Sequence, residues 1–189
     1  WFPKITITFL KPRRFEIAED IKGRERRRMA GVKLYDLMSE MIFQTTDRSQ
    51  TLYAAMLEAK SIHGGGQPVA EDIERKPMSY SRLVLGSTIL GRKLCRFTKK
   101  AENVGVMLPN SLGAVTTFFA LQAYGRVPAM LNFSTGSKNM VAAVETAGIE
   151  TVLTSRRFVE AAKLEDTVDA LAEKVSIVYL EDIRRKVGA

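Results

Sequence analysis

The sequence contains very few of the residues that build redox, metal and nucleophilic sites. It has one cysteine, Cys95, and one histidine, His63. A single cysteine cannot form a disulfide within the chain, and one cysteine with one histidine cannot supply a zinc site or a Cys-His pair unless the two meet in space. Because chains of this size with so little cysteine usually work in a reducing compartment, we expect a cytoplasmic protein.

Long apolar runs and extremes of composition are also missing. No apolar run approaches the roughly 20 residues that span a bilayer. The 189 residues are 46% hydrophobic and 26% charged, which is the balance of a globular protein and excludes collagen-like, fibrous and globally disordered chains. The chain begins at Trp1, without an initiator methionine or a signal-peptide pattern, so we expect a piece of a longer polypeptide.

Basic residues outnumber acidic ones and give a net charge of +8. They number 12 against 8 acidic residues up to His63, and 17 against 13 after it. The excess suits an anionic partner. A nucleic-acid-binding domain would concentrate it more, so we expect no nucleic acid partner.

The first 63 residues predict one strand and two helices. Residues 5–9 alternate apolar and polar side chains, as a half-buried strand does. Residues 23–43 carry apolar side chains at spacings of three and four, and residues 52–62 do the same after a loop in which Asp47 or Ser49 could cap the helix. Three consecutive glycines then end this helix, and residues 64–78 have the composition of a linker.

From residue 79 onward the pattern is that of an α/β domain, a parallel sheet with flanking helices. Ser79 and Ser111 are each placed to cap a helix. Short apolar strands alternate with helices of about three turns, which favours parallel strands joined by crossovers. The strands are expected at 104–108, 127–131, 151–153 and 175–180, and the intervening helices at 112–124 and 137–147.

One cluster of side chains could bind an anion. Guanidinium groups pair with phosphate oxygens in a bidentate way, and a helix start adds free N–H groups, so the cluster could hold lipid phosphate head groups. The alternative is a solvated helix end, which is the more common role of such a cluster. Its members are Lys22, Arg24, Arg26, Arg27, Arg28 and Lys33.

No residue pattern indicates a catalytic, cofactor or metal site. The three glycines neither follow a strand nor precede a Lys-Ser/Thr pair, so they do not form a phosphate-binding loop. Ser111 lacks the flanking glycines of a nucleophile elbow. Glu165, Asp166 and Asp169 are expected on a solvent-exposed helix face.

The part of the chain from Ser79 resembles the start of the acyl-adenylate-forming enzymes, the superfamily of acyl-CoA synthetases and luciferase-like proteins. The matching segments are Ser79-Tyr80, residues 103–111 (NVGVMLPNS), residues 123–132 (AYGRVPAMLN) and residues 151–154 (TVLT). The resemblance implies an early part of a parallel-sheet domain that frames an acyl and adenylate pocket. ATP and Mg²⁺ are the implied cofactors. The family's phosphate loop, magnesium-binding acid and catalytic lysine have no match here, so no catalytic residue is transferred and we expect the piece to be inactive alone.

The first sixty residues resemble the tail of a glycerolipid acyltransferase domain and the connector of proteins that fuse this domain to an acyl-carrier-protein synthetase. The matching segments are residues 2–7 (FPKITI), Lys22-Gly23-Arg24 with Arg26-Arg27, residues 34–41 (LYDLMSEM), Leu57-Glu58-Ala59 and His63-Gly64. The resemblance implies phospholipid re-acylation at the inner face of the cell membrane. The implied partners are a fatty acid, acyl carrier protein or coenzyme A, and a lysophospholipid.

These observations divide the chain into an acyltransferase tail and connector at 1–63, a linker at 64–78 and a ligase-domain start at 79–189. Because an incomplete sheet leaves an open edge, we also expect self-association. Two other functions remain open. One is a non-catalytic module that binds a lipid surface. The other, a dinucleotide-binding domain, lacks the expected Gly-x-Gly-x-x-Gly after a strand.

Overall fold

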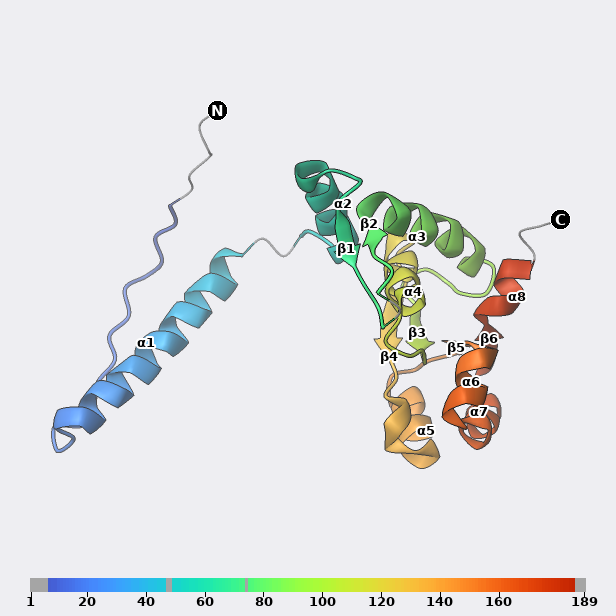
Figure 1. The fold of residues 1–189 in the computed structure, drawn as a ribbon. Coiled ribbons are helices and arrows are strands. Elements are labelled where there is room, and N and C mark those ends of the chain that lie inside the picture. The colour runs from blue at the N-terminus through green and yellow to red at the C-terminus, as the bar shows by residue number, and fades with distance from the viewer. Residues whose placement is uncertain (1–6, 47–48, 74, 186–189) are drawn as a thin grey trace. The chain divides into compact units, whose positions relative to one another are not determined.

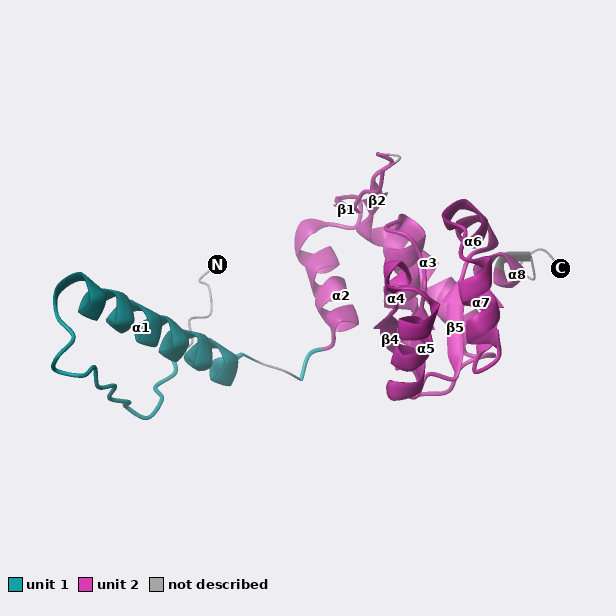
Figure 2. Cartoon of the chain, turned by 90° about the horizontal axis from the view of Figure 1, so that it is seen from below, with its two compact units in different colours: residues 1–50 teal, residues 51–189 magenta. Residues whose placement is uncertain are grey.

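The computed structural model describes residues 7–46, 49–73 and 75–185. The chain forms two compact units, residues 1–50 and residues 51–189 (Figure 2). This division lies before the linker expected at 64–78.

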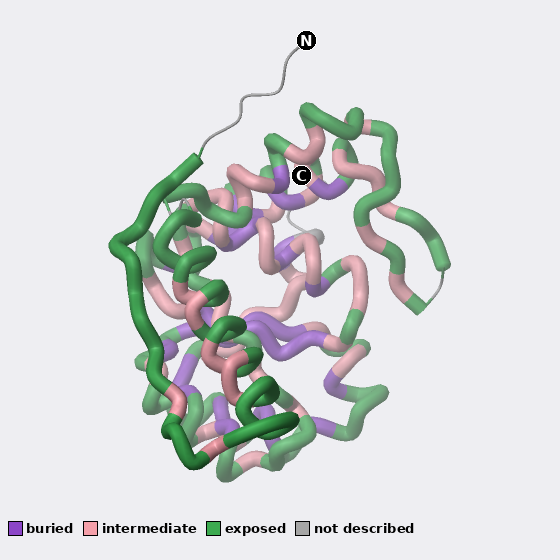
Figure 3. The backbone as a smooth tube through the Cα atoms, turned by 90° about the vertical axis from the view of Figure 1, so that its left-hand side faces the viewer, coloured by how far each residue is buried: buried purple, intermediate pink, exposed green. Residues whose placement is uncertain are grey.

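The first unit is an extended segment beside one long helix, α1 (Gly23–Thr45). The helix confirms the one predicted at 23–43. Of the predicted strand, Ile5 and Thr6 lie outside the described residues. Residues 7–9 are not a strand, because the described residues of this unit contain no other strand to pair with them. No residue from 7 to 46 is buried, as the absence of the buried colour shows (Figure 3).

The second unit begins with helix α2 (Leu52–His63), as the spacing at 52–62 predicts. Its cap is Thr51, whose side chain accepts a hydrogen bond from the Ala54 N–H. The interpretation of Ser49 as the cap is therefore wrong, and the other candidate, Asp47, lies outside the described residues. Thr51 stands directly before the first helical residue, where its oxygen reaches the unpaired N–H groups of the first turn.

Two short antiparallel strands, β1 (Pro68–Ala70) and β2 (Met78–Ser79), lie within the predicted linker and at its end. This segment is also attached to the helix that follows it. Gly65 and Gln67 carbonyl oxygens accept hydrogen bonds from the N–H groups of Ser81 and Tyr80, at 2.9 and 3.1 Å. These bonds fix the region of the three glycines to the second unit, whereas the composition alone suggests a free linker.

The central sheet has four strands, all parallel, in the order β4-β3-β5-β6 (Figure 1). Gly105 at its centre pairs with Ala129 on one side and Val152 on the other. Each strand lies where the sequence predicts it, which confirms the α/β class. The strands are β3 (Asn103–Val106), β4 (Val127–Met130), β5 (Thr151–Thr154) and β6 (Ser176–Tyr179).

Six further α-helices and a short 3₁₀ helix complete the described part of the second unit. As predicted, the side chains of Ser79 and Ser111 cap α3 and α4 by accepting hydrogen bonds from the N–H groups of Arg82 and Ala114. The sequence does not predict the bounds of α6 and α7, between β5 and β6, or of α8 after β6, because these helices are too short to show a clear period. The elements are α3 (Tyr80–Leu94), α4 (Leu112–Ala123), η1 (Phe133–Thr135), α5 (Ser137–Thr146), α6 (Arg156–Ala162), α7 (Glu165–Ala172) and α8 (Leu180–Arg185).

Two buried apolar clusters lie on opposite faces of the sheet. One joins Val104 and Leu153 to α4, α8 and the end of α3. The other joins Val152 to α5, α6 and α7. Adjacent residues 152 and 153 belong to different clusters because successive side chains of a strand point to opposite faces. The unit is therefore a three-layer sandwich with a sheet covered on both sides.

Candidate active-site region

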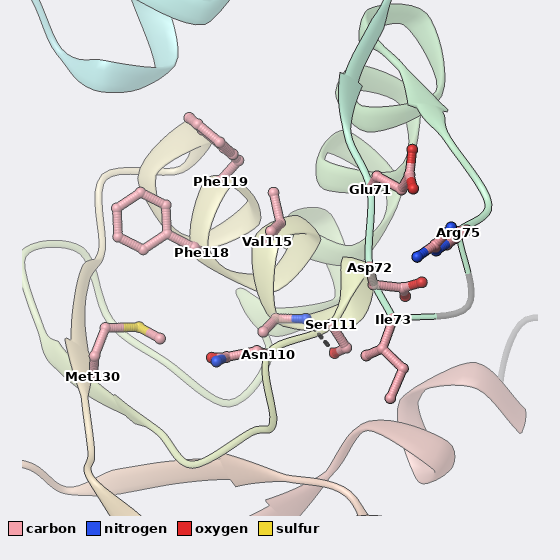
Figure 4. A pocket seen from close by; sticks show the side chains of 11 residues that line it. Glu71, Asp72, Ile73, Arg75, Asn110, Ser111, Val115, Phe118, Phe119 and Met130 are labelled. Atoms are coloured by element: carbon pink, nitrogen blue, oxygen red, sulfur yellow. Dashed lines mark hydrogen bonds between the residues drawn. The ribbon is translucent and has the colours of Figure 1, made fainter.

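A hollow of about 820 Å³ lies at the carboxyl-terminal ends of β3 and β4. Asn110 and Ser111 follow β3, and Met130 is the last residue of β4. The hollow separates α4 from the segment 71–75 (Figure 4). In open parallel sheets, ligands bind outside the carboxyl ends of the strands, so its position is typical of a substrate site.

One wall of the hollow is apolar and comes from α4. Val115, Phe118 and Phe119 project from this helix, and Met130 lies across from them (Figure 4). The two phenyl rings meet edge to face with centroids 5.4 Å apart. Because α4 is apolar around most of its circumference, it packs on the core with one face and still offers this apolar surface to a ligand.

The opposite rim of the hollow is polar and acidic. Glu71, Asp72 and Arg75 line it. The Asp72 carboxylate accepts a hydrogen bond of 3.3 Å from the Leu112 N–H, the first residue of α4. A carboxylate at this end also suits the helix dipole. The contact therefore fixes the acidic segment to α4, and two carboxylates on this rim disfavour a triphosphate there.

A smaller cavity of about 230 Å³ lies at the same edge of the sheet, beside β5. Ser111, Ser155 and Glu181 line it. The Ser155 hydroxyl donates to a Glu181 carboxylate oxygen at 2.7 Å. The chain leaves β3 toward β4 and leaves β5 toward β6, so this cavity lies where the strand order reverses.

Glu181 holds a charged carboxylate at the start of α6. Partial burial raises the pKa of this carboxyl, but the hydrogen bond from the Ser155 side chain and the nearby backbone N–H groups outweigh it, and the net pKa lies below the ordinary glutamate value. The backbone groups that lower the pKa are those of Glu181, Arg156 and Arg157. The carboxylate thus stabilises the start of α6.

This shift predicts a pH dependence of stability. A carboxyl whose pKa is lower in the folded than in the unfolded protein adds stability above its unfolded pKa and loses it as the pH falls through the folded pKa. The free energy of unfolding should therefore decline less steeply in Glu181→Gln than in the unchanged protein below the ordinary glutamate pKa of about 4.3. Urea unfolding at a series of pH values measures this, with the exposed Glu160→Gln as control. Parallel curves for the protein and Glu181→Gln would contradict it.

The predicted anion-binding cluster is divided between two roles. Arg26 donates to the carbonyl oxygens of Ile17, Ala18 and Ile21, and Lys33 donates to that of Glu16 at 2.7 Å, so both hold the extended segment against α1. Arg28 pairs with Glu25 at 2.6 Å, and their hydrogen bond raises the pKa of the arginine and lowers that of the glutamate.

The remaining three members, Lys22, Arg24 and Arg27, are exposed. Within the described part of the chain, none of them has a side-chain hydrogen bond or ion pair. Anion binding by the cluster stays a prediction, and these three residues are the ones that could contribute to it.

The other candidates named in the sequence have structural positions. His63 stacks on Tyr80 with ring centroids 6.4 Å apart, and Cys95 is half-buried at the end of α3. Glu165, Asp166 and Asp169 are exposed, as predicted. The described residues contain no group of three or more His, Cys, Asp or Glu side chains that could hold a metal ion.

The residues that line the large hollow are not predicted by the sequence pattern. Phe118 and Phe119 look like core residues in a long apolar helix, and Asp72 lies in a stretch without periodicity. The one available signal was the position of α4, which follows the turn after β3, where a parallel sheet places its ligands. Among the described residues, no helix has the length and apolarity to cross a membrane.

Comparison with protein families gives a match over most of the chain. A family model described as "AMP-binding enzyme" matches residues 58–187, which is more than half of the sequence. The matched region begins within α2 and includes the whole parallel sheet and both cavities.

Several solved structures share this fold at low sequence identity. The unliganded O-succinylbenzoate coenzyme A synthetase (MenE) of Bacillus subtilis has a TM-score of 0.59 and 14% identity over 72% of this chain and 26% of its own. VinN in complex with 3-methylaspartate has a TM-score of 0.59 and 18% identity over 72% of this chain and 36% of its own. The N-terminal subdomain of Klebsiella oxytoca NpsA has a TM-score of 0.57 and 13% identity over 72% of this chain and 32% of its own. The chain thus spans about a quarter to a third of these proteins, and the likeness shows the fold.

Proposed function

The chain belongs to the AMP-binding enzyme family, and from this membership we propose that it is part of a ligase that activates a carboxylic acid with ATP as an acyl adenylate. The acid we propose is a fatty acid, and the acceptor a thiol of acyl carrier protein or coenzyme A. The observation that carries the proposal is the apolar hollow at the carboxyl edge of the family-matched sheet.

The hollow has the size and lining that an apolar acid requires. Ligand pockets usually measure about 300–1,000 Å³ and are mostly apolar with a few polar groups. This one measures about 820 Å³, with Val115, Phe118, Phe119 and Met130 on its apolar side. The acyl chain would lie against α4, where burial of its methylene groups supplies the binding free energy.

The described residues do not fit the cofactors that the family implies. The rim of the hollow carries the carboxylates of Glu71 and Asp72, which repel phosphate groups, and no metal-binding group occurs among the described residues. When bound, ATP with Mg²⁺ would turn the acid into a mixed anhydride. We assign neither to a residue of this chain, whose proposed role is to bind and orient the acid.

A fatty-acid titration tests this role directly. Phe118→Ser removes an aromatic ring from the apolar wall, so it should weaken the binding of a fluorescent fatty acid such as cis-parinaric acid by about tenfold. Phe97→Ser is the matched control, because Phe97 is 41% exposed and lies outside the hollow. Equal binding by the protein and Phe118→Ser, with unchanged thermal stability, would contradict the assignment.

A second activity, acyl transfer to a lysophospholipid at a membrane surface, rests on the resemblance of the first sixty residues. One structural feature favours membrane contact. Leu34, Met38 and Met41 form an exposed apolar stripe along α1, and Arg24 and Arg27 lie free near its start. A helix with exposed apolar and basic side chains can bind an anionic lipid surface.

Vesicle sedimentation tests the membrane contact. The chain should bind phosphatidylglycerol vesicles, and binding should weaken as salt is added. Replacing both free arginines, Arg24→Glu with Arg27→Glu, should weaken it by more than about tenfold. The control, Arg157→Glu with Lys138→Glu, makes the same charge change at exposed sites of the second unit. Vesicle binding that is unaffected by salt and by Arg24→Glu with Arg27→Glu would overturn this role.

A further inference from the structure

The outward face of α3 combines large apolar and basic side chains. The opposite face of this helix carries its buried residues, Leu83, Ser87, Gly91 and Leu94, and packs on α4 (Figure 1). On the outward face, Leu85 is 61% exposed and Ile89 is 47% exposed. These two residues are four apart and therefore adjacent on the helix surface.

Arginines flank this apolar pair along the same face. At 100° per residue, Arg82, Leu85, Ile89 and Arg92 fall within one narrow sector of α3, and Arg96 follows in the turn after the helix. All three arginines are exposed. Within the described part of the chain, none of their guanidinium groups has a carboxylate partner or a side-chain hydrogen bond. Other exposed arginines of the chain are paired, since Arg13 and Arg156 form ion pairs with Glu40 and Asp182.

We propose that this face of α3 is a docking surface for an acidic amphipathic helix of a partner protein. Leu85 and Ile89 would pack on apolar side chains at the centre of the contact, and the arginines at either end would bind carboxylates in a bidentate way. Arg82 and Arg92 are about 15 Å apart along the axis, a spacing that a helix lying alongside can match with its own carboxylates.

The geometry favours a helix over a lipid surface. A bilayer presents a plane and is bound by a broad apolar face. The sector on α3 is narrow, has only two large apolar residues, and places its charges in line with them along one axis. The surface is also separate from the acid-binding hollow, so the proposal does not depend on the proposed function.

A peptide-binding experiment with the full chain tests the proposal. The probe is a fluorescent synthetic helix with leucines at i+3 and i+7 between glutamates at i and i+10 on one face, and its binding is measured by fluorescence anisotropy. We expect binding that weakens with salt, and a loss of at least about tenfold for Arg82→Glu with Arg92→Glu. Leu85→Ser with Ile89→Ser should also weaken it, since the apolar pair forms the centre of the contact.

Two controls and two alternative ligands show whether the surface binds an acidic helix or something else. Arg157→Glu with Lys138→Glu matches the change in charge away from α3 and should leave peptide binding within about twofold. A peptide of the same composition with its glutamates spread around the helix should bind more weakly. Absence of peptide binding overturns the proposal. If, in that case, phosphatidylglycerol vesicles or a second copy of the chain bind in a way that depends on Arg82 and Arg92, the surface has that other ligand instead.

Discussion

Arg126→Met should lower the free energy of unfolding of the second unit by about 3 kcal/mol, because it removes several charge-assisted hydrogen bonds at once. The guanidinium donates to the Thr98 hydroxyl at 3.1 Å, to the Thr98 carbonyl at 2.7 Å and to the Tyr124 carbonyl. Thr98 is only 5% exposed, so water cannot easily replace these donors. The arginine thus ties the turn after α3 to the end of α4.

Urea unfolding of three further variants shows whether the hydrogen bonds cause the loss. Arg157→Met removes an exposed arginine and should change stability by less than about 0.5 kcal/mol. In a double-mutant cycle, Thr98→Val should cost less in the Arg126→Met background than in the unchanged protein, because the hydroxyl has then already lost its donor. Strict additivity, or an Arg126→Met protein as stable as the Arg157→Met protein, would contradict this role for Arg126.

Gly91→Ala should destabilise the second unit by about 1 kcal/mol, although alanine is the better helix former. A Cβ at Gly91 would lie 2.4 Å from the Tyr124 ring and 2.6 Å from the Ala120 carbonyl oxygen. The backbone oxygen cannot turn aside as a side chain can, so α3 and α4 must move apart. Overpacking of this kind costs about 1–3 kcal/mol, against a gain of about 1 kcal/mol in helix propensity.

Gly113→Ala is the matched control for Gly91→Ala, since it also replaces a helical glycine by alanine, but at an exposed position of α4. Its Cβ would meet only the Ser111 side chain at 3.5 Å, an ordinary contact. We expect it to leave the melting temperature equal or higher, while Gly91→Ala lowers it by several degrees. A Gly91→Ala protein as stable as Gly113→Ala would mean that the two helices are not packed as closely as described.

The sheet and its order of elements could be predicted from the sequence because local signals agree there. Each strand is a short apolar run bounded by turn residues, and Ser79 and Ser111 stand directly before helices. The caps hold because a serine oxygen needs only the N–H three residues ahead. The failed strand at residues 7–9 shows the limit: alternation predicts a strand, but a strand forms only where another one pairs with it.

The candidate site could not be predicted in the same way, because its residues meet only in three dimensions. Asp72 reaches the α4 N-terminus across 40 positions of sequence, and no local pattern marks that contact. Arg126 belongs to a segment that resembles a family motif, but the sequence does not predict its hydrogen bonds to Thr98. Phe118 and Phe119 resemble core residues in the sequence, because composition does not reveal which side of an apolar helix packs on the sheet and which side lines the hollow.

The most direct test of the central claim is ATP–pyrophosphate exchange by the full product of the gene that encodes this chain. We expect exchange that depends on a fatty acid, with Phe118→Ser raising the KM for the acid about tenfold while the KM for ATP changes little. The 189-residue chain alone should give no exchange. Exchange that no carboxylic acid stimulates, or an acid KM that Phe118→Ser leaves unchanged, would contradict the claim that this hollow binds the acid of an acyl-adenylate-forming ligase.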